Sequence, residues 1–510
     1  MRATWLGWLL TGLAAATVWL AVLRHPPGAT RDLFPSPDAP EYVAGAVRLH
    51  QQGDFAILVA GERLPSRYPP GYSAVLVPWL AAGVEPIDAP RRANAVLAAL
   101  LLAIVHAALW LRGRPAAAGL ATLLLATTPA FVVLARAPLS DLASTVLTTP
   151  ALFLLWRYAA GARLAFGVGA ALLLGLAINV RVGNVLFAPA AMLAWVAHTG
   201  ANTHRAATRG TALLLATIAG AAPVLLYQAR ELGNPFRTGY EVWIPGRATF
   251  LQAFDPDNVE PNLRYLLREL LQLEWRTTIA SEYGYGSYFG PAVVLLVALL
   301  VIVRPPSRTT RWLAIAAVGY AAAMLCYFFR DARFFVPLLP GAVAFAATRA
   351  IDVLGTGRRW LRAATATLLI LHVLGVPGSG CIADVPRYLV APPPANAPRH
   401  DLLAKLRRVD PGLLLVTFNP PHAHAMLSDA WTVAPANDDH DYRFHPAFFR
   451  YGAAERRRQV RATFAAGRPV YLLADERFDE WCRTIEVPEG TAWYRLSGDS
   501  DAGIARLTAR

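Results

Sequence analysis

Residues 164–180 read LAFGVGAALLLGLAINV, Arg181 follows, and residues 182–198 read VGNVLFAPAAMLAWVAH. Each run approaches the roughly 20 apolar residues that an α-helix needs to cross a lipid bilayer. The charge between them marks a point where the chain leaves the lipid, because a charged side chain is costly at the bilayer centre. We therefore predict two antiparallel membrane spans, 164–180 and 182–198, joined at Arg181.

The same pattern recurs from the start of the chain to about residue 380. Apolar runs of near-spanning length occupy 5–23, 93–111, 116–134, 142–156, 164–180, 182–198, 211–228, 287–303, 312–329, 334–348 and 363–379. The composition agrees, since 55% of the residues are hydrophobic and only 16% are charged, whereas a soluble protein needs more polar groups to cover its surface. The sequence predicts an α-helical polytopic membrane protein with about eleven transmembrane helices.

The run 71–84 is shorter; Pro69 and Pro70 precede it and Pro78 lies within it. We interpret it as a half-embedded interfacial segment. The short loops 112–115, 157–163, 199–210, 304–311 and 349–362 then all face one side of the membrane. They are rich in arginine and contain a single carboxylate, Asp352. Because cytoplasmic loops are enriched in Lys and Arg, this side is predicted to be the cytoplasmic side of an inner (plasma) membrane.

The opposite side receives the long loops 24–92 and 229–286, and the chain after residue 379. We expect a transmembrane catalytic domain over 1–379 and a soluble extracytoplasmic α/β domain over 380–510. In the latter, β-type runs at 412–418, 469–474 and 492–496 accompany an amphipathic stretch at 446–466. The net charge of +14 does not indicate a nucleic-acid partner, because the basic residues lie between apolar runs and do not cluster with aromatic residues on a soluble surface.

Ionisable residues close to the predicted outer membrane surface are the candidates for chemistry, because such positions are costly without a function or a partner. They are Asp38, Glu41, Arg67, Asp141, Arg181, Arg330, Asp331 and Arg333. Asp38, Glu41 and Tyr42 have i, i+3, i+4 spacing and would share a helix face. The same spacing also fits a capping box, which by itself would account for both acids.

The other candidates also have two interpretations each. Arg67 and Tyr68 lie in a Pro-Pro-Gly turn, which either presents both side chains at the membrane surface or is a plain reversal of the chain. Asp141 either caps the span that follows it or supplies a second carboxylate. Arg181 either extends its side chain to the interface or binds a phosphate, to which Arg330 and Arg333 would add two more cations.

We expect no metal ion and no other cofactor. The pair His422 and His424, with Asp438, Asp439 and His440 nearby, is more typical of a solvated loop than of a metal site. The sequence contains no Walker loop, dinucleotide glycine fingerprint or Ser-His-Asp signature, and this argues against a nucleotide-driven pump.

Over about residues 1–350 the chain resembles the GT-C superfamily of membrane glycosyltransferases, which includes protein O-mannosyltransferases and lipid A aminoarabinose transferases. The resemblance rests on an acid–x–x–x–Tyr motif (Asp38 to Tyr42), a Tyr-Pro-Pro-Gly turn at 68–71 and a second acidic loop, ARAPLSD, at 135–141. The segments NPFRTGY at 234–240 and RFFVPLLP at 333–340 also look like bacterial members. The chain departs from the usual Asp-Glu pair, since Ala39 follows Asp38 and the partner acid is Glu41.

The resemblance implies a polyprenyl-phosphate-linked sugar as donor, membrane lipid as surroundings and a glycan, lipid or protein as acceptor. Asp38 would then be the general base of an inverting transfer at the outer face. Glu41, Tyr42, Tyr68 and Asp141 would bind or orient substrate, and Arg67, Arg181, Arg330 and Arg333 would stabilise the leaving phosphate. Two alternatives stay open: a multi-span secondary transporter, and a non-catalytic protein that binds lipid-linked sugars.

Overall fold

A computed structural model describes residues 2–23, 38–59, 62–86, 88–199, 203–240, 250–271, 289–303, 308–374, 414–417, 431–433, 453–474, 478–498 and 503–510. The chain forms two compact units. Unit 1 comprises Met1–His25, Arg91–Phe236 and Thr249–Ala391, and unit 2 comprises Pro26–Pro90, Arg237–Ala248 and Pro392–Arg510. The predicted division at 379/380 stays a prediction.

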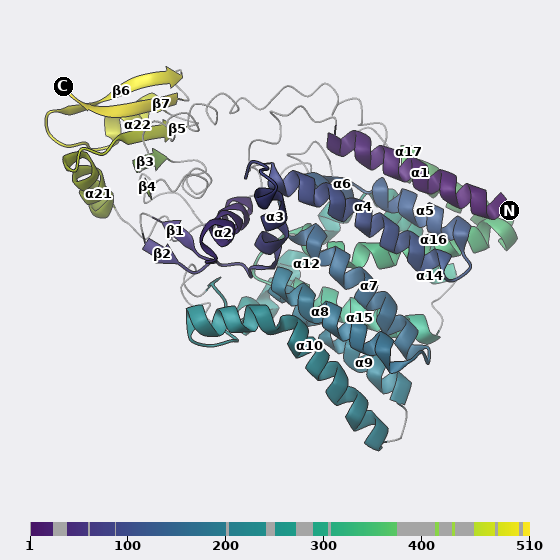
Figure 1. Ribbon diagram of the computed structural model, residues 1–510. Helices are drawn as coiled ribbons and strands as arrows, with labels where there is room; N and C mark the ends of the chain where they lie inside the picture. The colour runs from purple at the N-terminus through teal and green to yellow at the C-terminus, as the bar shows by residue number, and fades with distance from the viewer. Residues whose placement is uncertain are drawn as a thin grey trace. The chain divides into compact units, whose positions relative to one another are not determined.

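Unit 1 is built from helices, several of which begin with proline, a residue suited to the first helical turn because no partner is needed for its missing N–H (Figure 1). The helices are α1 (Arg2–Leu23), α4 (Ala89–Trp110), α5 (Pro115–Ala126), α6 (Pro129–Arg136), α7 (Asp141–Ala159), α8 (Leu164–Val180), η1 (Val182–Phe187), α9 (Ala188–Thr199), α10 (Thr203–Leu232), η2 (Phe250–Ala253), η3 (Pro256–Asn258), α12 (Val259–Leu271), α14 (Pro291–Val303), α15 (Arg308–Leu325), η4 (Ala332–Leu338), α16 (Leu339–Thr356) and α17 (Arg359–Leu374).

The described part of each of the eleven predicted runs is mainly helical. By length and composition, three helices of the described chain could cross a membrane: Ala89–Trp110, Ala206–Leu232 and Ala332–Thr356. A fourth is added if α5 and α6, which are bent by 67° at Thr127 and Thr128, form one broken span. The remaining apolar helices are shorter than the length criterion. The number of eleven crossings therefore stays a prediction.

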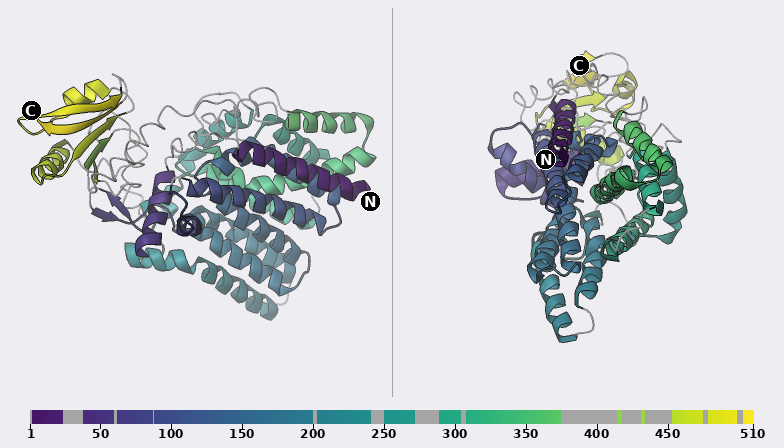
Figure 2. Two further views of the ribbon diagram at one scale, coloured as in Figure 1. Left: turned by 45° about the horizontal axis from the view of Figure 1, so that its top comes forward. Right: turned by 90° about the vertical axis from the view of Figure 1, so that its right-hand side faces the viewer.

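Helices α8 and α10 approach closely because glycine faces glycine where they meet (Figures 1 and 2). A Cβ atom on Gly175 would overlap the Thr217 carbonyl, and one on Gly220 would lie 2.9 Å from the Gly175 Cα atom. Such contacts between small residues are typical of membrane helix pairs. Close to this contact, the Asn179 amide donates to the Gly220 carbonyl (2.6 Å) and accepts from the Val224 N–H (2.8 Å). The C-terminal end of α8, and hence Arg181, is fixed against α10.

Unit 2 contains a helical pair and a hairpin near the start of the chain. The elements are α2 (Ala39–Gln52), β1 (Ile57–Val59), β2 (Glu62–Leu64) and α3 (Gly71–Ala81), with β1 antiparallel to β2. Helix α3 covers the run interpreted as interfacial; it packs on α2, and the Ser73 hydroxyl donates to the Tyr42 carbonyl (2.8 Å). Its insertion into the lipid interface stays a prediction.

The C-terminal region of unit 2 contains a five-stranded sheet in the order β4-β3-β5-β7-β6 (Figure 1). Its elements are β3 (Leu414–Thr417), β4 (Trp431–Val433), α21 (Ala453–Ala465), β5 (Val470–Ala474), α22 (Phe478–Thr484), β6 (Thr491–Gly498) and β7 (Gly503–Ala509). Strand β3 is parallel to β4 and β5, whereas β7 is antiparallel to β5 and β6. The described parts of the three predicted β-type runs lie mainly in β3, β5 and β6, and the described part of the amphipathic stretch 446–466 lies mainly in α21.

Candidate active site

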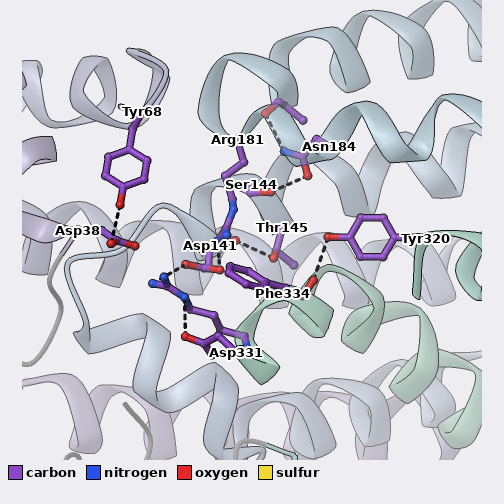
Figure 3. A network of polar contacts seen from close by, with 12 residues as sticks. Asp38, Tyr68, Asp141, Ser144, Thr145, Arg181, Asn184, Tyr320, Asp331 and Phe334 are labelled. Carbon is purple, nitrogen blue, oxygen red and sulfur yellow. Dashed lines mark hydrogen bonds and ion pairs between the residues drawn. The ribbon is translucent and has the colours of Figure 1, made fainter. Parts of the chain in front are cut away.

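Asp38 precedes the first residue of α2, where a capping side chain would be expected to bond the helix N–H groups. Its side chain makes no capping hydrogen bond. Instead, the Tyr68 hydroxyl donates to Asp38 Oδ1 at 2.6 Å (Figure 3). Burial raises the pKa of the Tyr68 phenol well above its ordinary value, so the phenol is neutral near pH 7 and keeps its proton for this bond. Helix capping therefore does not account for Asp38.

Glu41 and Arg67 form a buried ion pair in unit 2. Glu41 is 0% exposed and Arg67 is 6% exposed. Arg67 Nε donates to Glu41 Oε1 at 2.5 Å, its Nη2 also pairs with that oxygen, and the Arg67 backbone N–H donates to Oε2 at 3.3 Å. Burial raises the pKa of the Glu41 carboxyl, and the Arg67 guanidinium opposes this shift. Glu41 thus holds the turn that carries Arg67 and Tyr68.

Aromatic rings surround this turn within unit 2. The Tyr42 ring centroid lies 4.8 Å from that of Tyr68 and 5.0 Å from that of Tyr72. Tyr240 meets Tyr68 edge-on, with the centroids 6.1 Å apart. A Cβ atom on Gly239 would overlap the Ser66 carbonyl, so only glycine fits this close approach. Sequence reasoning did not assign Gly239 or Tyr240 to the site, although both belong to the NPFRTGY segment at 234–240 that contributed to the GT-C resemblance.

Asp141 is the first residue of α7 and is 1% exposed. Its Oδ1 atom pairs with the Arg181 guanidinium (Figure 3), and Arg333 Nη1 lies 4.0 Å from Oδ2. Position one of a helix also favours a carboxylate, because the helix dipole is positive there. The structure therefore brings together three predicted site residues of unit 1, Asp141, Arg181 and Arg333, although nearly 200 sequence positions separate the first from the last.

Two polar contacts fix Arg181 relative to Asp141. The Ser144 hydroxyl, one turn along α7 from Asp141, donates to Asn184 Oδ1 at 3.0 Å (Figure 3). The Asn184 backbone N–H donates to the Arg181 carbonyl at 3.0 Å, which closes the turn between α8 and η1. The helix that carries the acid and the turn that carries the cation are thereby linked directly.

Arg333 is held by its own turn at the start of η4. The Asp331 carboxylate accepts from the Arg333 backbone N–H and lies 2.9 Å from Arg333 Nε. Phe334 contacts both cations, since its ring centroid lies 5.2 Å from the Arg181 guanidinium carbon and 5.4 Å from that of Arg333. Within the described part of the chain, the exposed Arg330 forms no ion pair with this cluster.

The opposite end of α7 has a different character. Trp156 lies fifteen residues from Asp141, which is about 22 Å along a helix. The Arg112 guanidinium lies 3.8 Å from the Trp156 ring centroid, and Arg114 pairs with Asp352 at 2.6 Å. Within unit 1, these residues of the arginine-rich loops and the Asp141 cluster thus lie at opposite ends of α7, as the orientation argument requires. Their sides of the membrane stay a prediction.

The described residues contain no group of three or more His, Cys, Asp or Glu side chains that could hold a metal ion. The histidines His422, His424 and His440, together with Asp438 and Asp439, lie outside the described residues. The acids that were predicted for the site are instead paired with arginine or bonded to tyrosine. Arginine and tyrosine side chains donate hydrogen bonds, so this combination of side chains suits a phosphate and a hydroxyl group better than a metal cation.

The whole chain is similar in structure to membrane glycosyltransferases. ArnT from Cupriavidus metallidurans bound to undecaprenyl phosphate aligns with a TM-score of 0.64 and 13% identity, over 98% of this chain and 97% of that one. The apo form of ArnT gives 0.63 and 14%, over 99% and 98%. This chain has the GT-C fold.

A second GT-C enzyme supports the same assignment. The archaeal oligosaccharyltransferase AglB from Archaeoglobus fulgidus, in complex with an inhibitory peptide and a dolichol-phosphate, aligns with a TM-score of 0.53 and 12% identity, over 92% of this chain and 69% of that one. No family profile and no curated protein sequence matches this chain. The GT-C resemblance predicted from the motifs is confirmed at the level of fold.

Proposed function

We propose that this GT-C protein is a glycosyltransferase that moves a sugar from a polyprenyl-phosphate donor to an acceptor hydroxyl. The observation that carries the proposal is the cluster of Asp141, Arg181 and Arg333 at one end of the unit 1 helices. Two fold neighbours support the donor class, since ArnT is seen with undecaprenyl phosphate and AglB with dolichol-phosphate.

The leaving group of such a reaction is a phosphate, and its negative charge grows as the bond to the sugar breaks. Arg181 suits this charge because its side chain is 22% exposed and pairs at present with Asp141, so a phosphate oxygen can share the guanidinium. Arg333 is almost fully buried beside the same acid and adds a second cation in a low dielectric. The exposed Arg330 stays a predicted donor contact.

Asp38 is our candidate for the general base. In the proposed step, the acceptor oxygen bonds to the anomeric carbon while the carbon–oxygen bond to the phosphate breaks. The acceptor proton passes to Asp38, and polyprenyl phosphate leaves. In-line attack would invert the anomeric centre. The Tyr68 hydroxyl holds one carboxylate oxygen of Asp38, which orients the other toward a substrate.

Glu41, Arg67 and Tyr42 were predicted to bind substrate. Their near-complete burial supports a more specific proposal, in which they act through the turn that carries Tyr68. Asp141 would orient Arg181. We place the reaction at the outer face of the inner membrane, with the C-terminal α/β region outside, because the arginine-rich loops are predicted to be cytoplasmic.

The test is a turnover assay with the purified protein and polyprenyl-phosphate sugars. Asp38→Asn should lower kcat by roughly 10²- to 10⁴-fold, the usual contribution of a general base. Asp54→Asn is the matched control in the same unit, since Asp54 pairs with Arg48 and Arg63, and it should retain turnover. Unchanged turnover in Asp38→Asn would remove Asp38 as the base. A transporter or a binding protein would release no polyprenyl phosphate.

A further inference from the structure

Asn94 is a fully buried polar residue on α4 that the proposed chemistry does not use. Its Nδ2 group donates to two backbone carbonyls, that of Leu134 at 3.1 Å and that of Ala137 at 2.5 Å. Both carbonyls lie at the C-terminal end of α6, immediately before Pro138. One side chain from a distant helix therefore closes the end of α6.

The chain itself leaves this end of α6 short of donors. The last carbonyls of a helix have no partner within the helix, and Pro138 has no N–H to offer the Leu134 carbonyl. Leu134, Ala135 and Ala137 are all 0% exposed, so bulk solvent does not reach this end of α6, and an unpaired carbonyl in such surroundings is costly. A primary amide has two N–H donors. One bonds the Leu134 carbonyl, which Pro138 cannot pair, and the other adds to the bond that the Ala137 carbonyl accepts from the Leu139 N–H at 2.7 Å.

The far end of α6 is held in a similar way. His372 on α17 is buried, and its Nε2 atom lies 3.1 Å from the Leu124 carbonyl and 3.4 Å from the Thr128 hydroxyl, at the break between α5 and α6. Polar side chains from two other helices thus fix both ends of an eight-residue segment. The loop after this segment, 137–140, leads directly into Asp141.

We infer that Asn94 is a positioning residue that holds Asp141 in register with Arg181. The inference deepens the proposed function and rests on it for its catalytic meaning. The loop between the Asn94-bonded carbonyls and Asp141 is short, so a shift at Ala137 moves the Asp141 carboxylate. Since Asp141 pairs with Arg181, the shift changes how the guanidinium meets the donor phosphate.

The test compares Asn94→Leu, which keeps the size of the side chain and removes both donors, with Thr148→Val. Thr148 is also buried and lies on α7, and its hydroxyl makes one long bond to the Thr145 carbonyl (3.4 Å). In the full-length protein, Asn94→Leu should raise hydrogen exchange in peptides covering 137–145 by about 10-fold or more. Thr148→Val should leave this exchange as in the wild type.

The kinetic readout separates positioning from general stability. Asn94→Leu should raise the donor KM by about 10-fold and also lower kcat several-fold, because the perturbed guanidinium both binds the donor phosphate and stabilises the charge that grows on it. Loss of folded enzyme alone would lower the apparent kcat and leave the donor KM unchanged. Asn94→Ala, which removes both donors without placing a large apolar group against the carbonyls, should show the same changes if the leucine variant does not fold. Thr148→Val should change neither constant.

The two proposals fail differently. The positioning role is overturned if hydrogen exchange at 137–145 is unchanged in both Asn94 variants. It is also overturned if Thr148→Val raises this exchange as much as the Asn94 variants do. If the wild type neither binds polyprenyl phosphate nor releases it from a donor, the proposed function fails, and the exchange result still decides whether Asn94 holds the loop.

Discussion

The ion pair between Glu41 and Arg67 offers the sharpest test of how unit 2 is held together. Glu41 is 0% exposed and Arg67 is 6% exposed, so neither charge is solvated. Removing one partner of a buried pair costs about 3–5 kcal/mol, because the other charge is left uncompensated. Glu41→Gln should therefore lower the free energy of unfolding by at least about 3 kcal/mol, since Arg67 cannot shed its proton.

The reciprocal variant should behave differently because a carboxyl can take up a proton. Burial raises the pKa of Glu41 above its ordinary value of 4.5, while Arg67 opposes the shift. In Arg67→Met this opposition is lost. At acid pH the carboxyl is protonated in both the folded and the unfolded chain, and the penalty is small. As the pH rises through the window between the two pKa values, only the unfolded chain ionises, and stability should fall by about 1.4 kcal/mol per pH unit.

The assay is thermal or denaturant unfolding of the detergent-solubilised chain between about pH 5 and pH 8. Glu260→Gln is the control, because Glu260 and Arg264 form a pair whose side chains are 65% and 63% exposed; its cost should not exceed about 0.5 kcal/mol. The reasoning is refuted if Glu41→Gln costs no more than this control, or if the penalty of Arg67→Met does not depend on pH.

Three further outcomes follow from particular contacts. Gly175→Ala should destabilise the chain by about 1–3 kcal/mol in unfolding assays, because its Cβ would overlap the α10 backbone. Gly169→Ala is the control and should be neutral, since its Cβ would lie 3.7 Å from a Leu154 methyl. Equal effects of the two substitutions would argue against the close contact between α8 and α10. The pKa of Asp54 is lowered to about 2, chiefly by its hydrogen bond with Arg63. The ion pair therefore stabilises the fold above about pH 4, and pH titration should show this stabilisation fade toward pH 2 in the wild type but not in Asp54→Asn. In a chain whose three native cysteines are replaced by serine, cysteines placed at 38 and at the exposed position 330 should react with a membrane-impermeant thiol reagent from the same side of the membrane, and labelling from opposite sides would contradict a shared outer face.

Periodicity and composition predicted the helical elements well. The described parts of the eleven apolar runs are mainly helical because each is a stretch of apolar, helix-compatible residues bounded by charge, proline or glycine, and these signals are local. The strands β3, β5 and β6 were predicted for the same reason. Arg181 was predicted as a break, and it adopts an extended backbone conformation between α8 and η1.

Pairing was less accessible to sequence reasoning. The i, i+3 spacing of Asp38 and Glu41 fitted a capping box, but the structure assigns Asp38 to Tyr68 and Glu41 to Arg67. A local motif indicates which hydrogen bonds a side chain is able to make. Which partner it bonds depends on the groups that lie near it in the folded chain. Gly239 and Tyr240 illustrate the same limit, since their neighbours come from a turn about 170 residues earlier in the chain.

The sequence alone determined that the chain is rich in apolar helices, which positions combine a charge with apolar surroundings, and where the arginines concentrate. These properties follow from side-chain transfer energies and helix periodicity, which depend only on the nearby sequence. Tertiary structure decided which acid meets which arginine and that Asn94 closes the end of α6. Such contacts join residues of widely separated segments, and their energies arise only when several helices have packed together and excluded water.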